Sequence, residues 1–150
     1  MNSVPKESVA RLLLDVWSLG DVSAVSDLIG ERYTVFHDPG DPWDGQILDR
    51  AGYVARVLQS RAPFPDQSFS ICEMLEEKDK VAVTWKWKGT HRLSVAGIAA
   101  TNRLVHMTGA TIYSFEGASI VGHWQVTGPP RRVPTIITGP RWMTSTRARG

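Results

Sequence analysis

The sequence has little cysteine, no long hydrophobic run and no acidic residue after Glu116. Because Cys72 is the only cysteine, it leaves no partner for an intrachain disulfide and no cysteine-based metal cluster. No apolar run approaches the ~20 residues that a membrane-spanning helix needs. The first residues also lack the basic segment and apolar stretch of a secretory signal. We therefore expect a cytoplasmic protein that folds without covalent cross-links.

Several catalytic motifs are missing as well. The sequence contains neither a glycine-rich phosphate loop nor a Gly-x-Ser-x-Gly turn. Its four histidines, His37, His91, His106 and His123, show no helical ligand spacing and no accompanying pair of close carboxylates. These absences count against P-loop chemistry, against an α/β-hydrolase and against a metal site.

Charge is distributed unevenly along the chain. All 15 acidic residues, but only 12 of the 17 lysines and arginines, precede Gly128, so 12 minus 15 leaves this part at about −3. The remainder has five arginines and no acid. A basic tail can bind nucleic acid or acidic lipid, but arginines scattered among proline, glycine and threonine are more typical of a solvated end. We predict a domain over residues 1–128 and an extended or disordered tail over 129–150.

The first part of the domain has helical periodicity. A length of 150 residues fits one domain, and three apolar groups recur at helical spacing within Val9–Trp17, Val22–Ile29 and Tyr53–Leu58. The residues expected to bound these helices are Pro5 and Gly20, Asp21 and Gly30, and Asp49 and Pro63. Between the second and third helices we expect a short β-rich run at Tyr33–His37 and a loop over residues 38–42.

From Ser68 onward the hydrophobic period changes to two. Residues 68–77, 80–91, 102–115 and 119–127 are therefore predicted to form four strands joined largely by tight turns. Helices followed by an antiparallel meander favour an α+β domain. In such a domain a curved sheet wraps around the N-terminal helices and leaves a cavity at its open end, where small molecules commonly bind.

Several segments follow one another in a characteristic order and spacing: His37–Trp43, Ala62–Asp66, Asp79–Val83 followed by Trp85, Gly89–His91, Gly97 with Thr101 and Arg103, Ile112–Gly117 and Ile120–Trp124. In these segments the chain resembles the SnoaL-like polyketide cyclases of the nuclear-transport-factor-like superfamily. The resemblance runs over residues 5–127.

This resemblance implies a cone-shaped fold, a frequent homodimer, and a site that uses neither cofactor nor metal. Well-known members of the family close a ring of an aromatic polyketide by intramolecular aldol condensation, and close relatives include hydroxylases. The sequence departs from the family at the acid/base aspartate position, which is Gln125, and at its partner histidine, which is Thr111. A later aspartate found in many relatives is Gly128 here.

Carbon deprotonation needs a base, and histidine titrates in the useful range without tuning. His123 shares a strand face with Gln125, so His123 is the first candidate base and the Gln125 amide a candidate donor to an oxyanion. His37 and Asp38, expected near the cavity mouth, complete the predicted catalytic set. Each of these residues could instead be structural: His123 could fill a sheet face, and Asp38 and Asp41 could build turns.

Ligand contacts are predicted from aromatic and polar residues expected around the cavity. They are Phe36, Trp43, Tyr53, Arg56, Trp85, His91, Thr111, Tyr113 and Trp124. Trp85 and Trp87 alternate with Lys86 and Lys88, which gives that strand an aromatic face. This face could stack on a planar ligand, fill the sheet core or form a subunit interface, and we expect it to mediate a homodimer through the sheet.

Three functions remain open from the sequence. The first is an enzyme that performs cofactor-free acid/base chemistry on a small, apolar, carbonyl-bearing substrate. The second is a binding module that keeps the pocket and has lost the catalytic aspartate, and the third is an inactive relative. The expected partners are a small hydrophobic ligand, polycyclic or polyketide in kind, and a second copy of the chain, with no nucleic acid or membrane.

Overall fold

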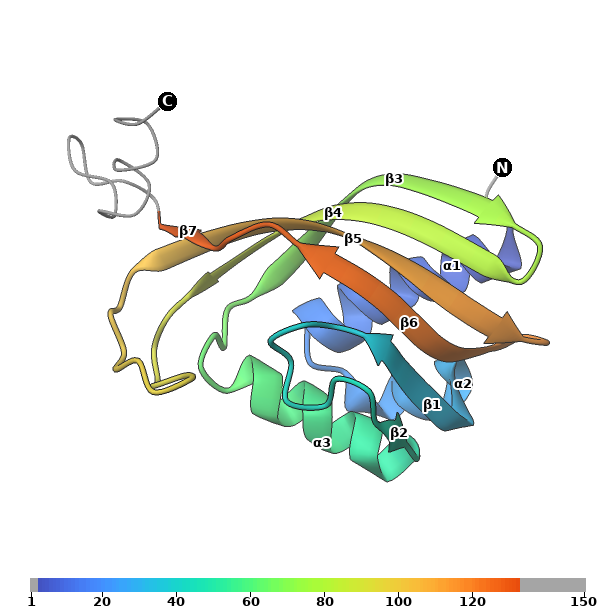
Figure 1. Cartoon of the computed structure of the whole chain (residues 1–150), viewed down its shortest axis with the longest axis horizontal. Coiled ribbons are helices and arrows are strands. Elements are labelled where there is room, and N and C mark those ends of the chain that lie inside the picture. Colours follow the sequence, from blue (N-terminus) through green and yellow to red (C-terminus); the bar gives the residue numbers. More distant parts are fainter. Residues whose placement is uncertain (1–2, 133–150) are drawn as a thin grey trace.

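A computed structural model of the protein describes residues 3–132. Its helical segments are α1 (Val4–Arg11), the π-helical η1 (Leu12–Ser18), the short 3-10 turn η2 (Val22–Ala24), α2 (Val25–Leu28) and α3 (Arg50–Arg61). Its strands are β1 (Ile29–His37), β2 (Ile47–Leu48), β3 (Ser68–Glu77), β4 (Lys80–Thr90), β5 (Leu104–Glu116), β6 (Ser119–Thr127) and β7 (Arg131–Arg132). The helices lie on the concave side of one curved sheet (Figure 1), which confirms the predicted α+β cone.

The first and third helices form where the sequence predicted them. Ser3 caps α1 by accepting the Lys6 backbone N–H, and Asp49 caps α3 by accepting the Gly52 N–H. The apolar stripe within Val9–Trp17 is buried against the sheet. None of the helices among residues 3–132 is long and apolar enough to cross a membrane.

The prediction of the second helix is wrong at its C-terminal end. Only η2 and the single turn α2 are helical, and Ile29 and Gly30 already belong to β1. Ile29 pairs with Ile120 of β6, and a side chain at position 30 would lie 3.0 Å from Val121 Cγ1. Pairing with a distant strand therefore outweighs the local helical pattern, and the expected short β-run becomes a nine-residue strand.

The four strands predicted after Ser68 are confirmed. Strands β3 and β6 have the predicted bounds, whereas β4 ends one residue earlier at Thr90 and β5 runs from Leu104 to Glu116. The sheet order is β2-β1-β6-β5-β4-β3, and β1 lies parallel to β6 while β3 to β6 form an antiparallel meander. This order places β1 beside β6, which the sequence did not indicate.

Of the predicted tail, the structure describes only its start. Residues 131–132 form β7, which pairs with β5, and residues 133–150 of the predicted tail lie outside the described residues. The boundary at residue 128 and the character of the tail stay predictions.

The aromatic face of β4 lies inside the molecule. Trp85 and Trp87 are only 3% and 5% exposed and belong to the core, whereas Lys86 and Lys88 on the opposite face are exposed. The expectation that Trp85 and Trp87 leave an apolar face for a partner subunit is therefore wrong, because residues of the same chain, among them Phe64 and Phe69, already pack against them.

Close packing of Trp85 generates a stability prediction. A Cβ at Gly109 would lie 2.4 Å from the Trp85 ring and 2.8 Å from the Val126 carbonyl oxygen. Gly109→Ala should therefore lower the free energy of unfolding by about 1–3 kcal/mol, as overpacking typically does, measured by urea denaturation. Gly128→Ala, whose Cβ would meet nothing closer than 3.3 Å, is the control, and equal stability of both variants would contradict this account.

Candidate active site

Asp38 begins the loop that follows β1, and this loop turns its carboxylate into the cone. The Asp38 backbone N–H donates to Asp44 Oδ1 at 2.7 Å, and the Trp43 N–H donates to Asp41 Oδ1 at 2.8 Å. Such aspartate turns give the loop a defined shape. The Asp38 side chain is thereby nearly enclosed, with 6% of the residue exposed.

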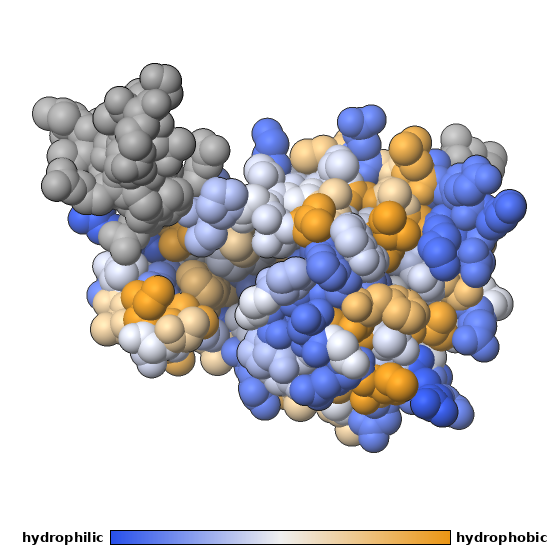
Figure 2. All heavy atoms as spheres, viewed as in Figure 1, coloured by the Kyte–Doolittle hydropathy of each residue, from blue (hydrophilic) through white to orange (hydrophobic). Residues whose placement is uncertain are grey.

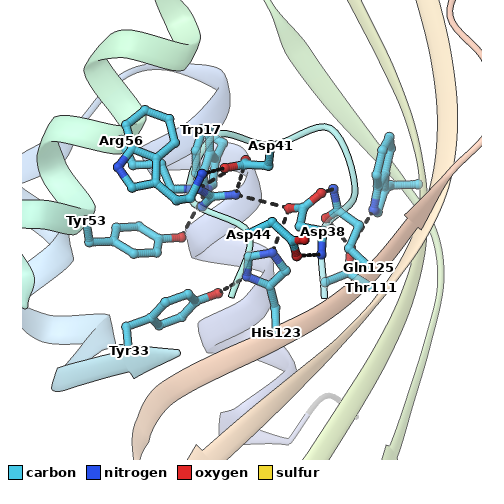
Figure 3. Close-up of polar contacts among 12 residues, drawn as sticks. Trp17, Tyr33, Asp38, Asp41, Asp44, Tyr53, Arg56, Thr111, His123 and Gln125 are labelled. Carbon is cyan, nitrogen blue, oxygen red and sulfur yellow. Dashed lines mark hydrogen bonds and ion pairs between the residues drawn. The ribbon is translucent and has the colours of Figure 1, made fainter. Parts of the chain in front are cut away.

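His123 lies between Asp38 and Tyr33 (Figure 3). Its Nε2 is 2.8 Å from Asp38 Oδ2, and its Nδ1 is 2.6 Å from the Tyr33 hydroxyl. Burial lowers the pKa of His123 more than its hydrogen bond to Asp38 raises it. Burial raises the pKa of Tyr33, because it disfavours the phenolate, so Tyr33 keeps its proton. These shifts assign a neutral imidazole that accepts from Tyr33 at Nδ1 and donates from Nε2 to Asp38.

Gln125 contacts the other oxygen of Asp38. A chain of donors orients its amide: Trp85 Nε1 donates to Thr111 Oγ1 at 2.9 Å, and the Thr111 hydroxyl donates to Gln125 Oε1 at 2.7 Å. The Gln125 nitrogen therefore faces Asp38, at 3.4 Å from Oδ1. This last bond is long and weak, so the amide nitrogen can exchange partners at little cost.

Arg56 holds two carboxylates of the loop. Its Nη2 is 3.3 Å from Asp38 Oδ2 and 2.9 Å from Asp41 Oδ2, and its guanidinium lies 4.9 Å from the Trp17 ring centre. Burial by itself would lower the pKa of Arg56, but the neighbouring Tyr53 and Asp41 raise it above its usual value. Arg56 is only 5% exposed. The sequence predicted that Arg56 contacts a ligand, whereas in the structure it binds and positions Asp38.

Most of the predicted site residues meet at this network. His123, Gln125, Asp38, Arg56, Thr111 and Trp85 are joined by the contacts above, and Tyr53 adjoins them through its ring 4.7 Å from that of Tyr33. The Tyr53 hydroxyl accepts from Trp17 Nε1 at 3.0 Å, so it is engaged within the protein. Tyr113 is buried with its ring centre 6.2 Å from that of His123, and Trp43 is half-buried against the core.

Three predicted site residues lie elsewhere. Trp124 is 44% exposed on the outer face of the sheet, and the His37 ring stacks on it at 4.4 Å. Phe36 is 54% exposed and covers Gly122. Since strand residues alternate between faces, His123 inside requires Trp124 outside, and this assignment could have been made from the sequence.

His91 lies at the end of β4, near the open end of the cone and away from the Asp38 network. The segment from 91 to 103 carries the exposed apolar residues Leu93, Val95 and Ile98. Figure 2 shows an orange cluster at the lower left, where Figure 1 places this segment, and a hollow separates the cluster from the main body.

Two members of the network were not among the residues predicted from the sequence. The sequence patterns indicated Tyr33 and Trp17 only as positions in a strand and on a helix face. Both are buried in the structure. Their polar atoms matter because each contacts a site residue. The only available signal was chemical, since buried tyrosine and tryptophan usually require a hydrogen-bond partner.

No metal centre is evident in this part of the molecule. Among residues 3–132, no three histidine, cysteine, aspartate or glutamate side chains are grouped so that they could hold an ion. In the site, the buried Asp38 carboxylate meets a neutral imidazole, a guanidinium that also binds Asp41, and an amide, a composition suited to proton transfer and to binding an oxygen atom.

The fold and this network define a cone-shaped α+β domain with a buried polar network on the inner side of its sheet. The sequence model of the SnoaL-like polyketide cyclases matches residues 7–128, and the chain belongs to this family. No curated protein sequence matches it.

Solved structures give the same fold. A candidate polyketide cyclase from Acidithiobacillus ferrooxidans is 39% identical over 99% of this chain and 96% of its own, with a TM-score of 0.80. IdmH, a candidate polyketide cyclase from Streptomyces antibioticus, is 25% identical over 82% and 91% of the two chains, with a TM-score of 0.67. AclR, a candidate hydroxylase from Streptomyces galilaeus, is 18% identical over 83% and 88%, with a TM-score of 0.68, and this likeness concerns the fold alone.

The lowered pKa of His123 generates a prediction for stability. In the unfolded chain this histidine binds a proton near pH 6.5, whereas in the folded protein it does so only at lower pH. The unfolded state therefore binds more protons just below pH 6.5, and the free energy of unfolding should fall there as the pH falls, by at most about 1.4 kcal/mol per pH unit.

Urea denaturation between pH 5 and 7 measures this slope. His123→Asn should reduce it by the contribution of one titrating group, whereas His106→Asn, at an exposed outer-face position, should leave it unchanged. An unaltered slope in His123→Asn would show that His123 is not held neutral.

Proposed function

We propose that this protein is a cofactor-free acid/base enzyme that acts on a small, apolar, carbonyl-bearing substrate. The reaction would be an intramolecular aldol cyclisation of the polyketide-cyclase kind, or a related isomerisation; a hydroxylation of the kind named for some relatives would in addition require dioxygen and a reductant as co-substrates. The observation that carries the proposal is a buried Asp38 carboxylate held between His123 and Arg56, beside a donor amide.

Asp38 is the proposed base. The sequence favoured His123, but both nitrogens of that imidazole already have partners within the protein. In Asp38, Oδ2 accepts from His123 and Arg56, whereas the one contact of Oδ1 within residues 3–132 is that with Gln125 at 3.4 Å. Oδ1 is thus the oxygen available to a substrate proton, and His123 acts as a positioning residue that orients the carboxylate.

Gln125 is the proposed donor to the developing enolate oxygen. An amide carries two N–H groups, so one can turn to the substrate while Thr111 keeps the carbonyl side of the amide in place. A donor placed in advance, in a site that excludes water, stabilises the oxyanion without reorganising at the moment of reaction.

The proton balance of the cyclisation closes within the site. Asp38 Oδ1 takes a proton from the carbon next to a ketone, and the electrons of that C–H bond form the enolate. The enolate carbon then forms a bond to a second carbonyl carbon of the same molecule. Asp38 returns its proton to the resulting alkoxide, so the product is an isomer of the substrate.

The inner face of the sheet favours an apolar substrate. Trp85 and Trp87 line it on β4, and Met107, opposite Trp87 on β5, is only half-buried. Flat aromatic surfaces of this kind bind planar rings through area and stacking, which supports a small hydrophobic, polycyclic or polyketide-like ligand.

The alternative is a binding protein without turnover. It is favoured by the complete internal pairing of His123 and by an amide at the position of the family's acid/base aspartate. Exchange of the α-hydrogens of a simple ketone separates the two readings, because a binder holds the ketone and leaves its exchange rate unchanged.

The first test uses 1-tetralone, a bicyclic aromatic ketone, in deuterium oxide. We expect the wild-type protein to accelerate the exchange of its α-hydrogens, measured by NMR. Asp38→Asn, which keeps the size of the side chain and removes the base, should slow this exchange by about 10²–10⁴-fold. Asp79→Asn, at an exposed residue, is the control.

Gln125 variants test the donor in the same assay. Gln125→Ala should cost about 10²–10³ in rate without changing the pH profile, and Gln125→Asp restores the carboxylate found elsewhere in the family. Exchange that persists in Asp38→Asn would move the base to another residue, and 1-tetralone binding without exchange in the wild type would favour the binding protein.

A homodimer belongs to the same proposal, through the outer face of the sheet. Phe36, Ile112, Trp124 and Val126 are 54%, 39%, 44% and 45% exposed there, and Ile112 lies opposite Trp124 in the β5–β6 register. A contiguous apolar patch of this kind commonly marks an interface.

Sedimentation tests the dimer. The wild type should sediment as a dimer, and Trp124→Glu as a folded monomer, because a charge would then lie in the interface. Leu19→Glu, at an exposed apolar residue of the helical side, should remain dimeric. A monomeric wild type at high concentration would contradict the proposal.

A further inference from the structure

One buried polar atom has no role in the network around Asp38. His91 is 5% exposed, and its Nδ1 lies 3.2 Å from the Thr101 hydroxyl. Its Nε2 is buried and has no hydrogen-bond partner among the residues that the structure describes. An unsatisfied buried nitrogen is costly, and such atoms in native proteins usually have a functional explanation or a bound water.

The surrounding structure holds the His91 ring in place. His91 stacks on Phe64 with ring centres 5.4 Å apart, and Phe64 in turn meets Trp87 edge to face at 5.0 Å. The backbone of His91 is tied across the segment by hydrogen bonds with Arg103 and Asn102. The unpartnered nitrogen therefore belongs to a side chain that is already held in one orientation. Little conformational entropy would be lost if a ligand bound to it.

His91 continues the inner-face series of β4. Residues 81, 83, 85, 87 and 89 alternate inward and are buried, and His91 follows in the same phase. Its backbone is hydrogen-bonded to Arg103, the residue that precedes β5. His91 thus stands at the open end of the same concave face that carries Thr111 and Gln125 further in.

The inner face of β5 connects these two ends. From Thr111 inward-facing positions run through Gly109, Met107 and Val105, and the last two are only half-buried. Six residues of strand span about 20 Å along the chain, and curvature of the sheet shortens the direct path. This stretch lies between the Asp38 network at one end and His91 at the other, with mainly apolar groups between them.

We propose that His91 Nε2 hydrogen-bonds a second polar group of the substrate, at the end opposite the reacting ketone. The proposal rests on the proposed function and narrows its substrate class. The substrate is an elongated, largely aromatic molecule with an oxygen function at each end. A short ketone such as 1-tetralone occupies only the inner end and does not reach His91.

The His91 imidazole would discriminate between ligands, because a ligand without the second oxygen function leaves Nε2 unpaired. A site built to bond a hydroxyl rejects the analogue that lacks it, because its own polar group then stays buried without a partner. A lost hydrogen bond of this kind corresponds to about a 10- to 100-fold difference in affinity.

The experiment compares two tetracyclic aromatic ketones that are identical except at the ring farthest from the ketone. One carries a hydroxyl group there and the other a hydrogen. Affinity is measured by quenching of tryptophan fluorescence in the wild type, in His91→Phe and in His106→Phe. His91→Phe keeps the ring stacked on Phe64 and removes both nitrogens, and His106→Phe is a control at an exposed position.

We expect the wild type and His106→Phe to bind the hydroxylated ketone about 10- to 100-fold more tightly, and His91→Phe to bind both ketones equally. His91→Gln provides a second variant, which should restore part of the preference through its amide. Equal binding of the two ketones by the wild type would overturn the role of His91 and leave the proposed function standing.

Two further outcomes also decide the proposal. Binding of neither ketone by the wild type would overturn the proposed function and, with it, the role of His91. A crystal structure in which an ordered water joins Nε2 to protein groups, with and without the hydroxylated ketone, would account for the nitrogen and overturn the role of His91 alone.

Discussion

The site depends on one constraint, which is that the Asp38 carboxylate is buried. An isolated charge in the interior is strongly unfavourable, and it persists only where partners replace the lost water. Here the partners come from two elements far apart in the sequence: Arg56 from α3, and His123 and Gln125 from β6. The carboxylate therefore requires the helix, the loop and the sheet to be in their final positions together.

The same constraint explains why the residues around Asp38 are arranged in chains of hydrogen bonds. Tyr33 orients His123, while Trp85 and Thr111 orient Gln125. Each buried donor or acceptor in these chains has its own partner, and a fully satisfied polar network holds its members in one geometry. In contrast, Nε2 of His91 is the atom for which the described residues provide no partner.

Strand alternation divides the chemistry between the two faces of the sheet. Inward residues of β4 to β6 build the core and the site, whereas outward residues carry lysines and the apolar patch with Trp124. A single strand such as β6 therefore contributes His123 to the site and Trp124 to the outer surface. This division corrects the roles of two residues: Trp85 serves the interior, and His37 stacks on the outside.

By itself, the sequence determined the elements whose signals are local. Pro5 near the start of the first helix, the Asp49 cap of the third and the alternation from Ser68 predicted α1, α3 and the meander β3 to β6, because these patterns depend on neighbouring residues. The membership of His123, Gln125 and Asp38 in one site was also accessible, through the face they share and the family resemblance.

Tertiary structure alone decided what depends on distant partners. The sheet drew Ile29 and Gly30 into β1 by placing them beside Ile120 and Val121 of β6, against the helical pattern of their own segment. The fold also placed the Asp38 carboxylate, rather than the His123 imidazole, at the centre of the network. Its hydrogen bonds to Arg56 and His123 join residues 18 and 85 positions away, and no local sequence pattern indicates such contacts. Local propensity amounts to a fraction of a kcal/mol per residue, and pairing and burial across the fold outweigh it.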